Sequence, residues 1–239
     1  SGGGGGGDVP APPPPVSDGG GGAEPPAEKG VAALEAVFVR PMPRWKRAID
    51  VLGSAVGLVL LLPVLAAAAV AVRLSSPGPI FFAQRRSGLG GRPFRMYKFR
   101  SMVVDAEARK AALMARNEQD GPAFKIKHDP RVTRVGRFLR ATSIDELPQL
   151  WNVLKGDMSL VGPRPLPVAE ADACDLWQRR RLDVTPGLTC IWQVRGRGKA
   201  SFADWVRMDL EYIRSQSLPQ DLRLLLLTGP AVVLRKGAH

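Results

Sequence analysis

An unbroken run of 22 uncharged residues, 51–72, constrains this chain more than any other feature. It is bounded by Asp50 on one side and Arg73 on the other. Because about 20 apolar residues cover the hydrocarbon core of a bilayer when they form a helix, the length of the run alone indicates a membrane segment. The sequence therefore predicts a membrane-associated protein.

Two features argue against an ordinary straight span. Pro63 lies at the thirteenth position of the run, where it removes a helical hydrogen bond and kinks or breaks the helix. Basic residues flank both ends of the run, and such residues mark the cytoplasmic side of a membrane helix. A helix over residues 44–74 that kinks at Pro63 and returns to the cytoplasmic face satisfies both observations. A plain span is the alternative.

The residues before this run have a different composition. Gly and Pro supply 18 of the first 30 residues, and such a stretch has too little apolar surface to offset the entropy of ordering. We expect residues 1–43 to form a disordered Gly/Pro-rich tail. A role of its proline cluster in binding a partner is the alternative to a solvated linker.

Residues 75–239 contain no second run of this length, so we expect a cytoplasmic globular domain. The fold class predicted for the whole chain is mostly α with a small extended hairpin. The hairpin is expected over residues 80–84 and 94–99, with glycines between them. Helical patterns cover residues 105–116 and 147–154, the second ending at Gly156, and Trp205, Met208 and Tyr212 mark a further helical face.

The C-terminal region contains two short apolar runs, 222–227 and 231–234, which Gly229 and Pro230 separate. Each is too short to span a bilayer, so we expect membrane-associated helices that pack in the core or rest in the interface. An interface between two copies formed by these runs, and hence a homodimer, is a hypothesis.

Cysteine and histidine usage limits the chemistry. The two cysteines, Cys174 and Cys190, suggest free thiols more than a disulfide framework, although a single bridge stays open. There are only two histidines, and no CxxC or HExxH pattern. These absences argue against a structural zinc site and a histidine-based triad.

The stretch around Asp145 and Glu146 carries the most chemical information. Ser143 and Glu146 have the S-x-x-E spacing of a capping box, which is a purely structural interpretation. The chain is, however, rich in arginine on both sides of this acid pair, with a net charge of +12 overall. Guanidinium groups bind phosphate oxygens in pairs, while a basic surface against anionic lipid is the bland alternative.

Adjacent carboxylates suit phosphoryl chemistry. On a helix Asp145 and Glu146 would point about 100° apart, so we expect different roles for them. One carboxylate would attack phosphorus as a nucleophile. The other would bind Mg²⁺, which takes one or two carboxylates together with substrate phosphates.

Six ordered motifs across residues 44–235 resemble the bacterial sugar transferase family, the monotopic polyprenyl-phosphate glycosyl-1-phosphate transferases. The motifs are Lys46-Arg47-Ala48-Ile49-Asp50, Pro77-Gly78-Pro79-Ile80-Phe81-Phe82 with Gln84 and Arg86, Tyr97-Lys98-Phe99-Arg100-Ser101-Met102, Asp145-Glu146-Leu147-Pro148-Gln149, Gly156-Asp157-Met158-Ser159-Leu160-Val161-Gly162-Pro163-Arg164-Pro165, and Pro186-Gly187-Leu188-Thr189 with Trp192-Gln193-Val194.

The resemblance implies a reaction and a place for it. A sugar 1-phosphate would pass from a nucleoside diphosphate sugar, with UDP-sugar as the usual donor, to polyprenyl (undecaprenyl) phosphate, releasing UMP. The enzyme would sit on the cytoplasmic face of the bacterial inner membrane. It would use a re-entrant helix kinked at a proline, here Pro63.

The resemblance also assigns residues. Asp145 would be the nucleophile that forms a covalent phosphosugar intermediate, Glu146 would coordinate Mg²⁺, and Arg140 would lie near the lipid phosphate. Further candidates for substrate or structural contacts are Lys98, Arg100, Asp157, Arg164, Gln193 and Arg197. The sequence Arg195-Gly196-Arg197 departs from the Asn-Gly-Arg of many relatives, which adds a cation to the expected nucleotide contact.

Three other functions are compatible with parts of the sequence. The pI of about 10.5 suggests a nucleic-acid binder, but no recognised binding motif accompanies the charge and the apolar run has no place in such a module, so we expect no nucleic-acid partner. A membrane adaptor would make Asp145 dispensable. A lipid phosphatase would release inorganic phosphate instead of a nucleotide. The sugar itself has no short signature.

Overall fold

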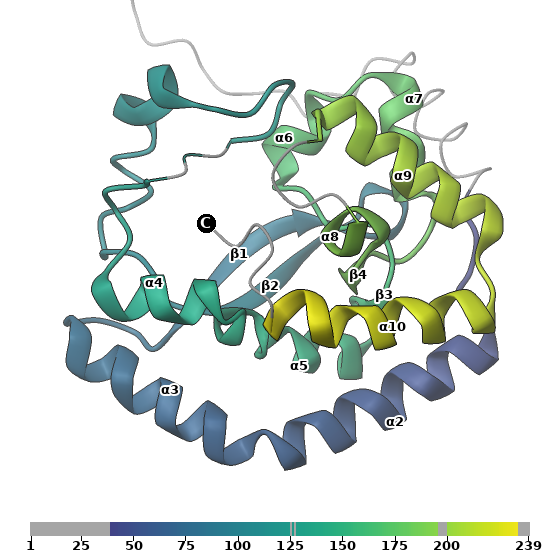
Figure 1. The fold of residues 1–239 in the computed structure, drawn as a ribbon. Helices are drawn as coiled ribbons and strands as arrows, with labels where there is room; N and C mark the ends of the chain where they lie inside the picture. The colour runs from purple at the N-terminus through teal and green to yellow at the C-terminus, as the bar shows by residue number, and fades with distance from the viewer. Residues whose placement is uncertain (1–38, 125, 127, 196–199, 234–239) are drawn as a thin grey trace, which may run out of the picture.

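The computed structural model describes residues 39–124, 126, 128–195 and 200–233. The predicted tail therefore lies almost wholly outside the described residues. Two helices, α2 (Arg44–Leu60) and α3 (Leu62–Ser75), contain the apolar run and lie along one side of the molecule, and the other elements gather on the opposite side (Figure 1). The two-helix unit matches the predicted range 44–74 closely.

A break at Leu61 separates α2 from α3. Pro63 is in the first turn of α3, where its missing N–H costs nothing because that donor has no intrahelical partner. The two helices diverge by 62°. Among the described residues no single helix is long and apolar enough to cross a bilayer, and only this bent pair meets the length and composition together. A straight helix through the run is therefore wrong, whereas a bent pair fits both a broken span and a re-entrant loop.

Outward-facing apolar side chains line the bent pair. Leu60 is 73% exposed, Leu62 63% and Leu74 82%. Trp151, which lies within the helical pattern predicted over residues 147–154, is also half exposed. Exposed apolar side chains in this number mark a surface that membrane lipid or another protein covers.

Polar side chains from the first two turns of α2 attach this helix to the domain. The Lys46 ammonium donates to Asp221 at 2.5 Å, and both side chains are almost fully buried. The Tyr212 hydroxyl lies 2.8 Å from the other Asp221 oxygen. This buried network joins α2 to α9 (Phe202–Ser215) and α10 (Leu218–Val233).

Asp50 forms the second attachment. Its Oδ1 accepts hydrogen bonds from the Ser159 hydroxyl at 3.0 Å and the Leu160 amide at 2.9 Å. Arg47 forms the third, because its guanidinium donates to the carbonyls of Val153 and Leu154, both at 2.7 Å. These carbonyls belong to the last turn of α5 (Gln149–Lys155), so Arg47 caps that helix from outside.

The predicted hairpin is confirmed. Strands β1 (Phe81–Ser87) and β2 (Pro93–Phe99) pair antiparallel, with Phe81 opposite Phe99 and Ser87 opposite Pro93. The connecting turn uses Gly90 and Gly91 at φ values of 59° and 76°, a region that favours glycine. One face of this hairpin forms a wall of the site described below.

A second, small sheet was not expected from the sequence. Strands β3 (Ser159–Val161) and β4 (Gly187–Thr189) pair in parallel. A Cβ at Gly187 would lie 2.0 Å from the amide nitrogen of Gly162, so the two glycines allow a close backbone approach that no side chain would permit. Arg164 follows two residues after Gly162, so this close approach lies next to the start of the chain segment that lines the site.

The remaining elements are short. They are the 3₁₀ helices η1 (Leu89–Gly91), η2 (Ala111–Arg116), η3 (Ile144–Glu146) and η4 (Arg180–Asp183), and the α-helices α4 (Arg134–Ala141), α6 (Val168–Asp172), α7 (Leu176–Arg179) and α8 (Ile191–Arg195).

Two local expectations are wrong. The composition of residues 105–116 favours a continuous helix, but only Ala111–Arg116 is helical, as a 3₁₀ segment. Most of these side chains are exposed, and an isolated helix this short is marginal without packing. At the C-terminus, Gly229 and Pro230 do not break the chain into two runs, since α10 continues to Val233.

Other expectations are confirmed. Helix α5 ends at Gly156, which has a φ of 96°. On α9, Tyr212 is buried, and Trp205 and Met208 pack against core clusters. Cys174 and Cys190 are both buried free thiols, so the disulfide alternative is wrong.

The buried Lys46–Asp221 pair generates a stability prediction. Asp221→Ala leaves a buried ammonium without its counter-ion, and we expect the free energy of unfolding to fall by about 3–5 kcal/mol. Denaturant unfolding of the detergent-solubilised protein measures this change. The double substitution Lys46→Met with Asp221→Leu removes both charges and should recover most of the loss. Equal destabilisation by the single and double variants would contradict the prediction.

Candidate functional site

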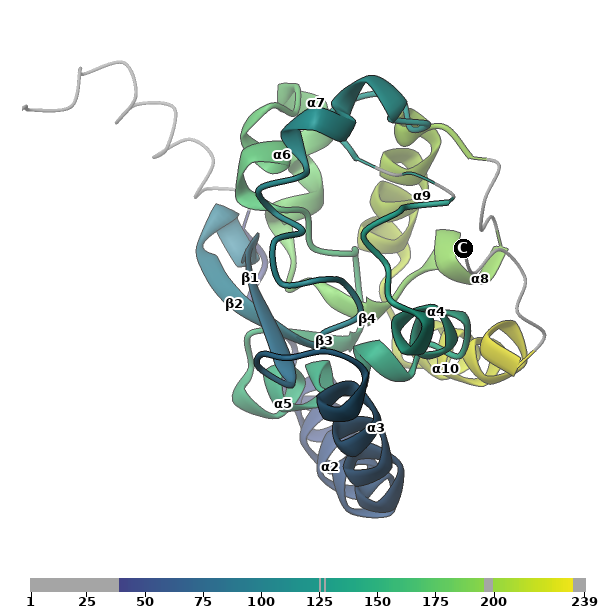
Figure 2. The same cartoon turned by 90° about the vertical axis from the view of Figure 1, so that its left-hand side faces the viewer.

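A cavity of about 430 Å³ opens beside the hairpin. Its walls come from β1 and β2, from the loop after β2, from the end of α4, from η3 and from the chain between Arg164 and Glu170. In Figure 2, α4 lies below the loop after β2, and α6 lies above the hairpin. The cavity therefore collects side chains from segments that are up to about ninety positions apart along the sequence.

The acid pair enters the cavity from a strained turn. Helix α4 is followed by Ser143 at a φ of 57°, the sole positive value at a non-glycine position in the described residues. The 3₁₀ turn η3 then presents Asp145 and Glu146, and both line the cavity. The Ser143 side chain makes no capping hydrogen bond. The capping-box interpretation is therefore wrong, because the Glu146 carboxylate has other partners.

Two cations hold Glu146. The Lys98 ammonium donates to its Oε1 at 2.9 Å, and the Arg164 guanidinium contacts both carboxylate oxygens, with the Nη1 to Oε2 distance at 3.2 Å. Burial acts to raise the pKa of Glu146, but the charges and hydrogen bonds of Arg164 and Lys98 hold it well below its usual value. Glu146 is therefore ionised throughout the physiological range.

Asp145 has the opposite electrostatic character. It is only 6% exposed. Burial, and next the charge of Glu146, raise its pKa to about 6, while Lys98, Arg140 and Arg164 partly offset the rise. Asp145 is thus ionised at neutral pH but poorly solvated, which is the state expected of a reactive carboxylate.

The cations around this pair come from three segments, namely β2, α4 and the chain that follows β3. Lys98 reaches the cavity from β2, and burial lowers its pKa while Glu146 opposes the shift. Arg140 comes from the last turn of α4, and its Nε donates to the Ser101 hydroxyl at 2.8 Å. Burial lowers the pKa of Arg140, and the charge of Asp145 acts against this. The structure thus brings together five of the residues singled out from the sequence: Asp145, Glu146, Arg140, Lys98 and Arg164.

Arg100 lines the same cavity but is engaged elsewhere. Its Nη2 donates to the carbonyl and the hydroxyl of Ser76 at 2.7 and 2.9 Å. Ser76 directly follows α3, and Arg100 is only 6% exposed. Arg100 therefore joins the end of the bent helix pair to the wall of the cavity.

The structure does not place the other sequence candidates in this cavity. Asp157 lies in the turn after α5, where it pairs with Lys155 at 2.8 Å and accepts from the Asn152 amide at 3.0 Å. Gln193 is buried in α8 and accepts from the Cys190 thiol at 3.0 Å. Arg197 lies outside the described residues.

Several charged residues that line the cavity were absent from the predicted site, among them Arg86 and Glu170. Arg86 donates to Gln84 and, at 2.8 Å, to the Pro165 carbonyl, and burial and then the charge of Arg164 lower its pKa to about 10. It shares one face of β1 with Gln84, as strand periodicity predicts, and the hairpin register puts Lys98 on the same face. Glu170 has no comparable signal, since α6 approaches the hairpin only through tertiary packing.

Two carboxylates of the cavity are the donors to consider for the expected magnesium ion. No group of three or more His, Cys, Asp and Glu residues capable of holding a metal occurs among the described residues. Asp145 and Glu146 nevertheless supply adjacent hard oxygens, and Glu146 Oε2 accepts one long hydrogen bond. Mg²⁺ commonly binds through one or two carboxylates and completes its shell with water and substrate phosphates. Asp145 and Glu146 are the residues that would hold such an ion.

Comparisons with known proteins identify relatives of this chain. The family described as "Bacterial sugar transferase" matches residues 42–235. The chain is 46% identical over 194 residues to the "Galactosyl transferase CpsE" of Streptococcus agalactiae, covering 81% of this chain and 43% of that protein. It is 43% identical over 214 residues to the "UDP-glucose:undecaprenyl-phosphate glucose-1-phosphate transferase" of Caulobacter vibrioides, covering 83% and 75%.

A third relative is the "Undecaprenyl-phosphate galactose phosphotransferase" of Salmonella typhimurium, which is 44% identical over 170 residues. That match covers 68% of this chain and 35% of the relative. The chain thus spans less than half the length of two of these three proteins.

Proposed function

We propose a function from the premise that the chain belongs to the bacterial sugar transferase family. The protein transfers a sugar 1-phosphate from a UDP-sugar to undecaprenyl phosphate and releases UMP, as the first membrane step of polysaccharide or glycoconjugate synthesis. The single observation that carries this proposal is the cavity in which an ionised, poorly solvated Asp145 faces a cluster of buried cations. The names of the relatives supply the substrate classes.

The chemistry takes two displacements at phosphorus. The Asp145 carboxylate attacks the phosphorus that bears the sugar, the bond from this phosphorus to the bridging oxygen breaks, and UMP leaves with that oxygen. An oxygen of undecaprenyl phosphate then attacks the aspartyl-linked phosphorus and frees Asp145. Both bonds that form are balanced by bonds that break, and no oxidant or reductant is required.

The neighbours of Asp145 lower the barrier by charge. Arg140, Lys98 and Arg164 lie where the phosphate oxygens gain negative charge, and fixed cations in a water-poor cavity stabilise such charge strongly. Glu146, held by Lys98 and Arg164, keeps both cations oriented. Mg²⁺ bound at Glu146 would further neutralise the diphosphate.

The bent helix pair gives the protein its location. We propose that α2 and α3 enter and leave the cytoplasmic leaflet of the bacterial inner membrane as a re-entrant unit, with the cavity on the cytoplasmic face. The exposed apolar side chains on both helices support this arrangement. So does Arg100, since its contact with Ser76 joins the end of α3 to the cavity that must receive the lipid phosphate. A homodimer stays a prediction, and Leu222 and Leu226, which are 47% and 78% exposed on α10, are among the side chains available for it.

The proposal predicts a donor-dependent release of UMP. Purified protein with Mg²⁺, undecaprenyl phosphate and a panel of UDP-sugars should release UMP from at least one donor, and Asp145→Asn should reduce the rate at least ~1,000-fold. Asp172→Asn, an exposed aspartate on α6, is the matched control and should keep the wild-type rate. Full activity of Asp145→Asn would refute the nucleophile, and release of inorganic phosphate would indicate a lipid phosphatase.

The raised pKa of Asp145 predicts a pH profile. Only the ionised carboxylate attacks, and its pKa is about 6, so kcat/KM for the donor should rise with pH through about 6 and then level. Below that value it should fall about tenfold per pH unit. This ratio is measured for the UDP-sugar, because both phosphates of a UDP-sugar are diesters that do not titrate near pH 6. A flat profile between pH 5 and 7 would contradict the assignment.

The re-entrant arrangement predicts that both ends of the bent pair face the same side. Single cysteines at Arg44 and Ser76, in a background with Cys174 and Cys190 changed to Ser, should both react with an impermeant maleimide in inverted membrane vesicles. Neither should react in intact spheroplasts. Reaction of only one site in each preparation would instead establish a helix that spans the membrane.

A further inference from the structure

The cavity has two chemically different ends. One end lies beside α4 and the loop that follows α3, and it contains Arg140 together with the exposed apolar side chains of Phe81 and Val104. The other end is bounded by α6 and the loop after β2. In both Figure 1 and Figure 2 the helices α3 and α6 lie on opposite sides of the hairpin, so the second end is the one farther from the bent pair.

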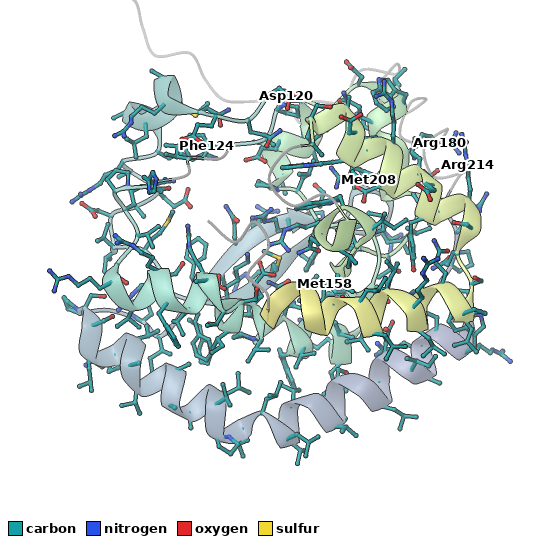
Figure 3. All side chains as sticks on the ribbon, viewed as in Figure 1. Asp120, Phe124, Met158, Arg180, Met208 and Arg214 are labelled. Carbon is teal, nitrogen blue, oxygen red and sulfur yellow. The ribbon has the colours of Figure 1, made fainter. Side chains whose placement is uncertain are left out.

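An aromatic ring forms one surface of the α6 end. Phe124 lines the cavity, and in Figure 3 it lies at about the same height as α6. The Lys110 ammonium is 5.2 Å from its ring centroid, and the Arg131 guanidinium carbon is 5.3 Å from it. Arg131 is itself fixed by Asp129 through hydrogen bonds at 2.9 and 2.6 Å. The ring is therefore held by two cations, one of which is rigidly positioned.

A carboxylate faces the same space. Glu170 lines the cavity from α6, its side chain is 13% exposed, and its Oε1 lies 3.6 Å from the Lys110 ammonium. Burial raises the pKa of Glu170, while Lys110 and then Arg86 act to lower it. The proposed transfer gives no task to Glu170, Lys110 or Phe124. A partly buried carboxylate and ammonium beside an aromatic ring nevertheless form a polar recognition surface.

Two neighbouring parts of the donor, its phosphates and its hexose, suit two neighbouring parts of the cavity. Phosphates suit the middle of the cavity, where Lys98, Arg164 and Arg86 gather beside the acid pair. A hexose presents several hydroxyl donors and a C–H face. An ionised carboxylate only accepts hydrogen bonds, and an ammonium only donates them, whereas a hydroxyl does both. Glu170 and Lys110 at fixed places can therefore recognise where a sugar carries its hydroxyl groups. The Phe124 ring offers an apolar surface to the C–H face.

We propose that the α6 end of the cavity binds the hexose of the nucleotide donor, and that Glu170 is a specificity-determining residue that accepts hydrogen bonds from its hydroxyl groups. This inference rests on the proposed function, which it deepens. Family membership leaves the hexose open, because the relatives are named for galactose in one case and glucose in another. A site built to bond a particular hydroxyl rejects the epimer, since its buried polar group is then left unpaired.

Equilibrium binding tests the inference without relying on transfer. The affinities of UDP-glucose, UDP-galactose and UDP are measured by calorimetry for the wild type and for Glu170→Gln in detergent. We expect Glu170→Gln to weaken the preferred UDP-hexose about tenfold, which corresponds to about 1.4 kcal/mol. The affinity for UDP should change less than twofold. Asp172→Asn, on the same helix but exposed, is the matched control and should change none of the three.

A second variant guards against a folding defect in the first. Phe124→Leu keeps an apolar side chain but removes the ring, and it should weaken UDP-hexose with the same sparing of UDP. In the transfer assay, Glu170→Gln should also change the ratio of kcat/KM between the two donors at least about fivefold.

Two results would overturn the inference. An equal loss of affinity for UDP and both UDP-hexoses would place the uridine at this end, and unchanged affinities in both variants would show that no part of the donor lies there. Failure of the proposed function is seen separately, as absence of UMP release by the wild type. The binding measurements would still decide whether this end of the cavity reads the sugar.

Discussion

The whole arrangement depends on how a helix that presents an apolar face outward is held by its other face. Lys46, Arg47 and Asp50 lie within the first two turns of α2, and each reaches a different element of the domain. Apolar packing alone would not fix the position of the helix along its axis, because hydrophobic contacts are non-directional. Buried charges and hydrogen bonds have specific partners, and removing any partner leaves a desolvated group that is costly to accommodate. The first half of the run is thereby held in one register.

The acid pair shows how two neighbouring carboxylates acquire different properties. Glu146 accepts hydrogen bonds from two cations and stays ionised, whereas Asp145 is buried beside that fixed negative charge and its pKa rises to about 6. The cations that stabilise Glu146 also lie close enough to Asp145 to keep it ionised at neutral pH. Separation of pKa values within a pair of titratable groups commonly divides their roles, and the proposed mechanism uses that division.

Local features were predictable and long-range contacts were not. The apolar run, the break near Pro63, the hairpin and the glycine after α5 each follow from neighbouring residues. So does the presence of two acids beside many cations. The partners of Glu146 do not, because Lys98 and Arg164 lie 48 and 18 positions away and only the folded chain selects them among many basic residues. The same holds for Glu170, and for the parallel pairing at Gly187 that depends on the closeness of Gly162.

The contact between Arg47 and the last carbonyls of α5 has a geometric consequence. Helix α5 begins three residues after Glu146. The acid pair therefore lies at one end of this helix, and Arg47 contacts its other end. If α2 lies in the cytoplasmic leaflet as proposed, the contact of Arg47 with α5 fixes the distance of Asp145 from the membrane surface. The phosphate of a polyprenyl chain is confined to the headgroup layer. A reactive carboxylate set at one height can therefore meet that phosphate while the chain behind it stays dissolved in the membrane.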